Sequence, residues 1–550
     1  MGYLFHILLA VGAQALGEAN LGLGIELPLL VPLLGAIPYL LVVRTRRLGR
    51  LGKFKRAGRA LRALQHSAPI LHFVAVGGLG WVDSVRLWTG ARLDLFGWPE
   101  PAMLLAIAPY VVLELLAIDA HPRANDMPQK ARRNMRAFQV RMFLSGLLPL
   151  FLYLVVAWGI GANDVVRVHI ERVAVWNAAF IVVMLIVLAL FLPALLRNTW
   201  ETVRLDSGPQ RAMLDVVAQR AGFDCRELLM WKTGNMMANA AIVGFAPGRR
   251  VVLFSDSLLD MLGLRELAAV FAHEIGHAVR HHVFIFLAWA LAIFLGGDLI
   301  ATYWLADASG GEWAAGGAAL AILAVWYFGF GWLSRRFECE ADLYSVELLG
   351  DHSAMISALE RVGGRLRDIA GWRHFSTADR VAFLERAVLD PAFAARFRRR
   401  LRFWALLGIV LAVTAAGLQG RDLVRSYPGD RLQVDLSLGD YASAAERAAG
   451  MELDPEIKSL VELASSMSVA AGGDVEIEDL DAALRAALDA RQLGRALALS
   501  ELAYLREGRG FEAIAYLLED LIDSDTESAR ARLDDVPEDW RERMAPLLDQ

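Results

Sequence analysis

The sequence predicts a mainly α-helical membrane protein with about eight transmembrane helices, a zinc-binding domain that includes a small β-sheet, and a C-terminal soluble helical domain. Three observations support this prediction. Of the 550 residues, 56% are hydrophobic, and the mean hydropathy of +0.40 is above the soluble globular average. Residues 273–277 read His-Glu-Ile-Gly-His. After Gly420 the chain has 29 acidic and 14 basic residues, whereas the net charge of the whole chain is only −5.

Eight segments are long and apolar enough, or nearly so, to cross a lipid bilayer. They lie near residues 22–43, 68–91, 102–118, 142–162, 173–196, 283–305, 314–333 and 403–419. Within the fifth, Phe180–Leu192 contains no polar residue, whereas Asp83 and Arg86 interrupt the second. Residues 4–17 are also apolar, but no cationic segment precedes them and no clear cleavage site follows, so we expect no cleaved signal peptide.

Basic residues between these segments predict the orientation. Residues 44–62 hold nine Arg or Lys, residues 123–141 hold six, and five arginines lie within residues 396–402. Because basic loops stay in the cytoplasm, eight alternating spans place all three stretches there. The His-Glu-Ile-Gly-His segment then faces the cytoplasm, and the C-terminal region lies on the opposite side. The chain has 51 arginines and 5 lysines, which favours a bacterial source, so we expect a multi-pass protein of the bacterial inner (cell) membrane.

Composition and span placement divide the chain into four parts. We predict a membrane domain with about five spans, a zinc-site domain with two spans, a last span and a soluble acidic helical domain. Their bounds are residues 1–197, 198–400, 403–419 and 420–550. Amphipathic stretches within residues 440–523 are compatible with a tetratricopeptide-like helix pair or with a plain helical bundle. These helices are candidates for binding a protein partner, and no nucleic-acid partner is expected.

The His-Glu-Ile-Gly-His segment has the spacing of a zinc site. The preceding run, Leu264–Ala272, is a strong helix former. On a helix, His273 and His277 share one face and can bind one Zn²⁺ ion, while Glu274 reaches a zinc-bound water as general base. A hydrolytic zinc site takes three protein ligands and leaves one position for water, so a third ligand must come from elsewhere.

Glu338 is the strongest candidate for the third ligand, because Glu338 and Asp342 lie one helical turn apart on the same face. The first carboxylate can bind the metal, and Asp342 can accept the free imidazole N–H of a ligating histidine. Glu340 would point to the opposite side, where it would be exposed or salt-bridged. Cys339 is expected to pack away from the ligands, and His282 is expected outside the first ligand set.

These motifs resemble those of the integral-membrane zinc metallopeptidases that include Ste-type CAAX prenyl proteases, HtpX-type heat-shock proteases and Oma proteases, which form peptidase family M48. The run Ser334–Glu338, followed by Ala341 and Asp342, is similar to the family's third-ligand motif. Two apolar spans between this motif and the histidine motif are a family trait. The resemblance covers about residues 200–400.

Downstream, His374 and Arg380 stand six residues apart, like a family pair that helps to stabilise the transition state. The resemblance therefore implies a catalytic role for both. The sequence departs from the family at Phe375 and Ser376, where prolines usually follow the histidine.

Upstream, Asn239-Ala240 and the following hairpin look like the family's edge strand. Leu228–Thr233, Ala238–Gly244 and Arg249–Phe254 are β-prone segments separated by Gly and Pro, and they predict a small antiparallel sheet. A free edge of that sheet could pair with an extended substrate, with Asn239 and Ala240 on that edge. Alternatively, the hairpin is purely structural.

The resemblance implies a gluzincin-like domain with Zn²⁺ as cofactor, in a membrane-embedded zinc metalloendopeptidase. Such an enzyme would hydrolyse peptide bonds of membrane-associated or misfolded proteins, with a protein or peptide substrate and the lipid bilayer as partners. One alternative is a CAAX-type prenyl-protein protease. The other is a non-catalytic membrane scaffold or receptor with a structural zinc site, which would have no need of Glu274 as a base.

Overall fold

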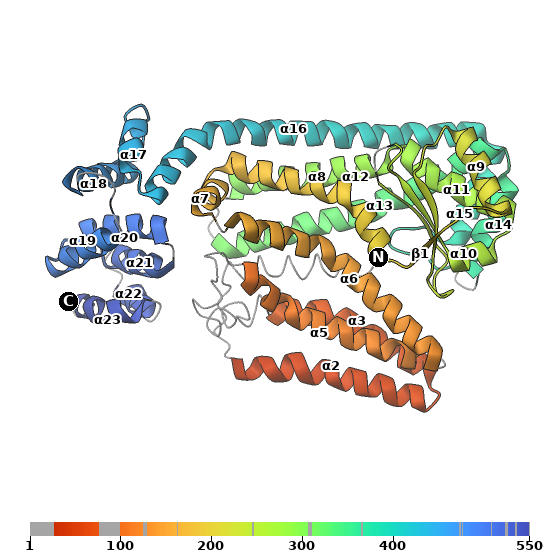
Figure 1. Cartoon of the computed structure of the whole chain (residues 1–550), viewed down its shortest axis with the longest axis horizontal. Coiled ribbons are helices and arrows are strands. Elements are labelled where there is room, and N and C mark those ends of the chain that lie inside the picture. The colour runs from red at the N-terminus through yellow and green to blue at the C-terminus, as the bar shows by residue number, and fades with distance from the viewer. Residues whose placement is uncertain are drawn as a thin grey trace. The chain divides into compact units, whose positions relative to one another are not determined.

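The fold consists of helices around one small mixed sheet (Figure 1). The structure, a computed structural model, describes residues 27–75, 100–124, 129–161, 163–244, 247–305, 311–364, 367–471, 475, 477–507, 509–522, 526–533 and 536–548. The chain divides into two compact units. The first comprises Met1–Trp158 and Met184–Gln419, and the second comprises Gly159–Val183 and Gly420–Gln550.

The first helices of the first unit pack against one another through small and apolar side chains. They are α2 (Leu27–Arg50), α3 (Phe54–Phe73), α5 (Glu100–Ala124) and α6 (Gln129–Gly161). Ala57, Leu64 and Ala120 are buried where α2, α3 and α5 meet. The basic stretch at residues 44–62, predicted as a loop, is instead largely helical. Apolar residues such as Ala57, Leu61 and Leu64 bury one helical face, whereas Arg44, Arg47, Arg50, Lys53, Arg56 and Arg59 are exposed.

Among the described residues, three helices are long and apolar enough to cross a membrane. A further pair of helices, joined by a sharp bend, gives a fourth span if the pair is taken as one. The three are Ala131–Tyr153, His282–Tyr303 and Pro391–Leu438, and the pair is Val165–Arg172 with Ala174–Leu188, bent by 99°. The predicted segments at residues 102–118 and 314–333 lie within helices that do not meet this criterion. Most of the segment at residues 68–91 lies outside the described residues. The count of eight therefore stays a prediction.

The sheet contains four strands in the order β1-β2-β4-β3. They are β1 (Thr202–Arg204), β2 (Glu227–Trp231), β3 (Ala240–Val243) and β4 (Val251–Ser255). β4 pairs in parallel with β2 and antiparallel with β3, so the prediction of a purely antiparallel sheet is wrong. β4 is buried throughout and apolar on both faces, and it lies between two neighbours. β3 is only partly buried, and it takes the edge.

Helices cover this sheet and complete the domain. They are α9 (Pro209–Ala221), α10 (Asp256–Met261), α11 (Leu264–Val279), α14 (His352–Gly363) and α15 (Thr377–Leu389). Phe271 of α11 meets Phe254 of β4 edge to face, with ring centroids 5.6 Å apart. Two long helices continue from this region, α12 (His282–Ile300, followed by a π-helical turn at Ala301–Leu305) and α13 (Gly311–Leu349). α16 (Pro391–Leu438) is the longest helix and runs from the first unit into the second.

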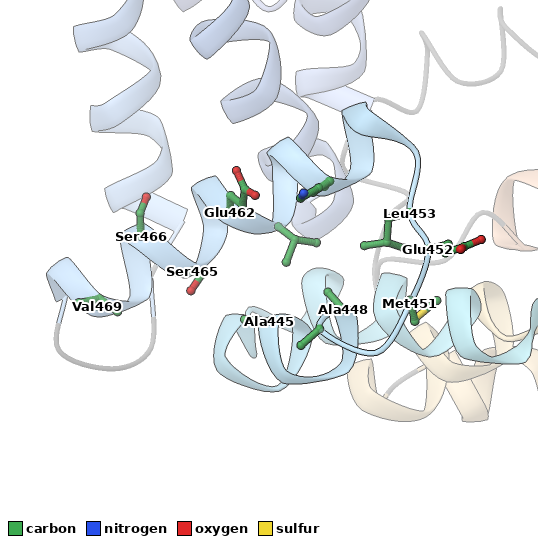
Figure 2. A pocket seen from close by; sticks show the side chains of 12 residues that line it. Ala445, Ala448, Met451, Glu452, Leu453, Glu462, Ser465, Ser466 and Val469 are labelled. Atoms are coloured by element: carbon green, nitrogen blue, oxygen red, sulfur yellow. The ribbon is translucent and has the colours of Figure 1, made fainter.

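The second unit is helical and has its own core. It contains α7 (Asp164–Arg172), the start of α8 (Ala174–Thr199), the end of α16, and α17 (Tyr441–Ala448), α18 (Pro455–Ala471), α19 (Ile477–Asp489), α20 (Leu493–Glu507), α21 (Arg509–Ile522), α22 (Thr526–Arg532), α23 (Glu538–Met544) and a 3₁₀ turn (Ala545–Leu547). Leu484, Leu499 and Leu517 are fully buried in this core. A groove of about 870 Å³ lies between α17 and α18 and is lined by Leu453, Lys458 and Glu462 among others (Figure 2). The choice between a repeat pair and a bundle stays open.

Candidate metal centre

Close packing of α11 against α13 brings the two sequence motifs together. The side chain of Glu266 caps the first turn of α11 by accepting a hydrogen bond from the Gly263 backbone N–H at 2.7 Å. At Gly276 a Cβ atom would lie 3.1 Å from the ring of Tyr344 and 3.2 Å from the Cα of Ala341. Glycine in the middle of the histidine motif therefore allows the backbone of α13 to approach. Without this contact the acidic residues of α13 would not reach the histidines.

Three donor atoms converge where the helices meet. His273 Nε2 lies 3.2 Å from His277 Nε2 and 3.5 Å from Glu338 Oε2, and His277 Nε2 lies 3.6 Å from Glu338 Oε1. Zinc bonds of about 2.0–2.2 Å at tetrahedral angles separate ligand atoms by about 3.3–3.6 Å. The two imidazole nitrogens are at this spacing from each other, and the Glu338 carboxylate turns a different oxygen toward each of them, so the three side chains fit zinc as protein ligands and leave a fourth position for water.

A buried carboxylate holds the first histidine. Asp342 is completely buried, and its Oδ1 lies 2.8 Å from His273 Nδ1. Arg380 forms a bidentate ion pair with the same carboxylate, with Nε donating to Oδ2 at 2.8 Å and Nη2 donating to Oδ1 at 2.6 Å. The contact with Asp342 favours a proton on His273 Nδ1, so the lone pair of Nε2 faces the metal position when the ring is neutral.

The second histidine is held by a chain of two further side chains. His282 Nδ1 lies 2.9 Å from His277 Nδ1, and His282 Nε2 lies 2.9 Å from Glu340 Oε2. The carboxylate accepts the proton of His282 Nε2, so His282 Nδ1 accepts the proton of His277 Nδ1. The lone pair of His277 Nε2 then points to the metal position. The ring of His282 also stacks on Phe337, with centroids 4.1 Å apart.

These contacts bear on two expectations. Of the two states expected for Glu340, exposed or salt-bridged, the structure has the paired one, and the carboxylate is buried against His282. His282 lies outside the three-donor cluster, as expected, but it touches His277 directly. The prediction assumed one continuous helix, whereas α11 ends at Val279 and His281 has a left-handed backbone conformation with φ of 56°. That turn brings His282 back over the site. Cys339 is buried and offers no donor to the cluster.

In the absence of a metal, burial and neighbouring charges give the three donor side chains different protonation states. Burial lowers the pKa of His273, but Asp342 and Glu338 outweigh burial and raise it to about 10. Burial and the neighbouring His273 hold the pKa of His277 well below its usual value. Burial opposes ionisation of Glu338, yet hydrogen bonds from His273 and His374 bring its pKa well below the usual range. His273 is thus the one protonated donor at neutral pH.

Glu274 follows His273 on α11. Burial, the largest influence, and the charge of Glu338 raise the pKa of Glu274 while His273 and Arg380 oppose the rise, and the net result is a pKa of about 7. A carboxylate with a pKa near the working pH can both take and return a proton, which is the property of a general base and acid.

The downstream pair predicted from the resemblance also reaches the cluster. His374 Nδ1 lies 3.1 Å from Glu338 Oε2, and half of the His374 side chain is exposed. Arg380 is buried, and its remaining Nη1 lies 3.4 Å from Glu338 Oε2. All three guanidinium nitrogens of Arg380 therefore face carboxylates. Ser376, where proline is usual in the family, caps α15 by accepting a hydrogen bond from the Asp379 backbone N–H at 3.1 Å.

Asn239 and Ala240 lie at the start of the edge strand. The carbonyl of Asn239 accepts a hydrogen bond from the Ser255 backbone N–H at 2.9 Å, and the Asn239 N–H donates to the Ser255 hydroxyl at 2.9 Å. Because hydrogen-bonded and non-hydrogen-bonded pairs alternate along antiparallel strands, the backbone groups of Ala240 and Ile242 point away from β4. The edge thus presents open donors and acceptors at every second residue.

Sequence reasoning missed the roles of Gly276, Glu340 and His282. The signal was present, since a third histidine follows the motif and a second carboxylate lies between Glu338 and Asp342.

Comparisons with known proteins agree with this geometry. Residues 209–392 match the sequence model of peptidase family M48. A protease HtpX homolog from Prosthecochloris aestuarii is 30% identical over an alignment of 181 residues, and the match covers 28% of this chain and 57% of that protein. A CAAX prenyl protease 1 homolog from Arabidopsis thaliana is 25% identical over an alignment of 196 residues, and the match covers 32% of this chain and 45% of that protein. The chain thus spans about half the length of these relatives.

Among solved structures, the crystal structure of S. mikatae Ste24p superposes with a TM-score of 0.46 and 14% identity, covering 68% of this chain and 98% of that chain. The sequence match rests on the segment that contains all the donors described above. Residues 209–392, which resemble peptidase family M48 in sequence, are therefore the part of the chain in which the metal centre lies.

Proposed function

We propose that this protein is a membrane-embedded zinc metalloendopeptidase that hydrolyses peptide bonds of membrane-associated or misfolded proteins. The observation that carries the proposal is the arrangement of His273, His277 and Glu338. Their imidazole nitrogens lie 3.2 Å apart, each nitrogen lies 3.5–3.6 Å from one oxygen of Glu338, and Glu274 is adjacent on α11. A structural zinc site is closed by four protein ligands, whereas a hydrolytic site keeps one position for water.

Each residue has a distinct part in the proposed reaction. A bound zinc ion supplies a Lewis acid that polarises the scissile carbonyl and acidifies water. Glu274 takes a proton from the attacking water and delivers it to the leaving amine. Asp342 keeps the ring of His273 in place, and Arg380 holds Asp342. His374 is half exposed beside Glu338, which suits a donor to the negative charge that develops on the carbonyl oxygen.

The edge strand supports a mode of substrate binding. Ala240 and Ile242 direct backbone donors and acceptors away from the sheet, so an extended peptide can add to β3 as a further strand. Such pairing recognises the main chain and not particular side chains. This fits a protease that accepts varied sequences, and we propose it for Asn239 and Ala240 in place of a purely structural hairpin.

Two further parts of the proposal concern the surroundings of the domain. Three long apolar helices, or four with the bent pair, favour insertion in a membrane, and the basic residues favour a cytoplasmic active site in a bacterial inner membrane. For the C-terminal helices we propose a protein partner, with the groove between α17 and α18 as its contact. The similarity to a CAAX prenyl protease 1 homolog keeps prenyl-protein processing as the second candidate function.

The experiment is the substitution Glu274→Gln in purified full-length protein, with a casein-like or membrane-protein substrate. We expect cleavage to fall by roughly a hundredfold or more while bound zinc stays at one ion per chain. Glu360→Gln, at an exposed ion pair with Arg367 on the surface of α14, is the matched control and should leave cleavage unchanged. Cleavage that survives Glu274→Gln with zinc still bound would show that the proposed mechanism is wrong. A chelator with zinc add-back separates metal dependence from a contaminating protease.

A further inference from the structure

An aromatic groove lies between α12, α13 and α16 and touches none of the zinc donors. Its volume is about 390 Å³, and its lining is almost entirely apolar. Phe286 of α12 stacks on Phe330 of α13 with ring centroids 4.4 Å apart, and Trp404 of α16 closes one end. Gly329 leaves room in the groove, since a Cβ atom there would meet nothing within 4 Å.

A second pocket of about 430 Å³ continues from the groove, because Trp332 and Trp404 line both. Three arginines line this second pocket: Arg336 from α13, and Arg396 and Arg400 from α16. Among the described residues Arg400 has no ion-pair or hydrogen-bond partner. The guanidinium of Arg336 stacks on Trp332 at 3.8 Å and donates one hydrogen bond from Nη1 to the Trp332 carbonyl at 2.8 Å, which leaves Nη2 to face an anion. Arg396 is paired with Asp390 at 3.2 Å, through Nη2 only.

The two pockets therefore form one site with an apolar half and a cationic half. The apolar half lies along α12, whose most apolar stretch has none of its residues buried inside the protein, so this half is open to a surrounding bilayer. Arg396 and Arg400 lie just before the apolar part of α16, and Arg336 follows the apolar part of α13. Trp332 and Trp404 line both halves, and tryptophan is enriched at the level of lipid headgroups.

We propose that this site binds an anionic phospholipid, with the phosphate against Arg336, Arg396 and Arg400 and one acyl chain in the aromatic groove. The positive charge of the arginines favours a phosphate group. The adjoining apolar groove favours a hydrocarbon chain attached to that phosphate, as in a phospholipid. The inference rests on the proposed membrane insertion and not on peptidase activity. Its readout is lipid binding, so it can fail while the proposed function stands, and the reverse also holds.

The experiment titrates purified full-length protein in neutral detergent with short-chain phosphatidylglycerol and follows tryptophan fluorescence, since four tryptophans line the site. We expect saturable binding of phosphatidylglycerol, and no comparable binding of phosphatidylcholine of the same chain length or of inorganic phosphate. The double variant Arg396→Gln with Arg400→Gln should weaken binding roughly thirtyfold, because each arginine near an anionic headgroup contributes about a factor of five.

Two matched controls decide the outcome. Arg399→Gln with Arg402→Gln removes the same charge from exposed positions of α16 that do not line the pocket, and it should leave the affinity nearly unchanged. Gly329→Leu fills the groove and should weaken binding roughly tenfold, equivalent to about two buried methylene groups, whereas Gly317→Leu on the same helix should not.

If the Arg396/Arg400 and Arg399/Arg402 double variants lose the same affinity for phosphatidylglycerol, the proposed site is wrong. The lipid is then attracted to the basic surface in general. If Gly329→Leu binds phosphatidylglycerol as tightly as the wild type, the acyl chain does not lie in the aromatic groove. A lipidated peptide without phosphate that binds as tightly as phosphatidylglycerol would overturn the choice of occupant.

Discussion

Nδ1 of His282 lies 2.9 Å from Nδ1 of His277. One of two imidazole nitrogens at this distance must carry a proton, and the carboxylate of Glu340 on the far side of His282 decides which. The arrangement fixes the tautomer of a metal ligand from a residue that is not itself a ligand. The zinc affinity of the site should therefore depend on the turn between α11 and α12, because this turn positions His282.

The first prediction follows from that contact. His282→Ala and Glu340→Gln should each weaken zinc binding by roughly 10- to 100-fold, the usual effect of removing an outer partner of a ligating histidine. Competition with a chelator of known zinc affinity measures this. His281→Asn is the control, because asparagine tolerates the left-handed backbone there and the side chain is exposed. An equal loss of affinity in the control would mean that the turn, and not the His282 ring, is what matters.

A second prediction concerns protons released on zinc binding. The pKa of His273 is raised to about 10, so its ring is protonated at pH 7.5 without metal, whereas His277 and Glu338 already carry their lone pairs. Zinc must displace the proton of His273, so about one proton should leave per zinc. The affinity should rise about tenfold per pH unit below pH 10. Calorimetric titrations in buffers of different ionisation enthalpy count these protons, and a count near zero would contradict the assignment.

A third prediction concerns the buried pair of Asp342 and Arg380. Asp342→Asn leaves the guanidinium of Arg380 buried with only Glu338 as an anionic neighbour, so the metal-free protein should lose about 3–5 kcal/mol of stability. Asp481→Asn breaks a half-exposed helix pair with Arg485 and should cost only about 0.5 kcal/mol. Thermal unfolding of both variants checks this. A loss for Asp342→Asn no larger than for Asp481→Asn would show that the buried pair contributes little.

A fourth prediction tests the approach of α11 and α13. Gly276→Ala places a Cβ 3.1–3.2 Å from Tyr344 and Ala341, so the helices must separate, at a cost of about 1–3 kcal/mol and with weaker zinc binding. Gly296→Ala, which meets nothing within 4 Å, should be neutral or slightly stabilising. Zinc affinity of Gly276→Ala equal to that of the wild type would show that the close approach is not required.

A fifth prediction separates substrate pairing from strand structure. Ala240→Pro removes an N–H that points away from the sheet, so zinc content and unfolding temperature should hold while kcat/KM for peptides falls by roughly tenfold. Ala241→Pro removes an N–H that faces β4 and should destabilise the sheet itself. If Ala240→Pro cleaves peptides at the wild-type rate, substrates do not add to this edge at Ala240.

Local patterns in the sequence were sufficient for much of the centre. Helical periodicity places His273 and His277 on one face, and the same rule pairs Glu338 with Asp342 one turn apart. The strand Val251–Ser255 could be predicted as β, but its parallel partner could not, because parallel pairing is set by contacts distant in the chain. The part played by His282 depends on one left-handed residue, His281, and the approach of the helices depends on Gly276. Tertiary packing determines the turn at His281 and the approach of the helices at Gly276, and neither can be predicted from hydrophobic periodicity.

The most direct measurement of the central claim is zinc K-edge X-ray absorption on the purified protein in its zinc-loaded form. A three-ligand open centre predicts only nitrogen and oxygen neighbours at about 2.0–2.1 Å, four in total, with one of them exchangeable for a small anion. Glu338→Ala should replace one protein oxygen and lower the affinity. A sulfur neighbour at about 2.3 Å, or four protein ligands that resist exchange, would mean a closed structural site and would contradict the proposed peptidase.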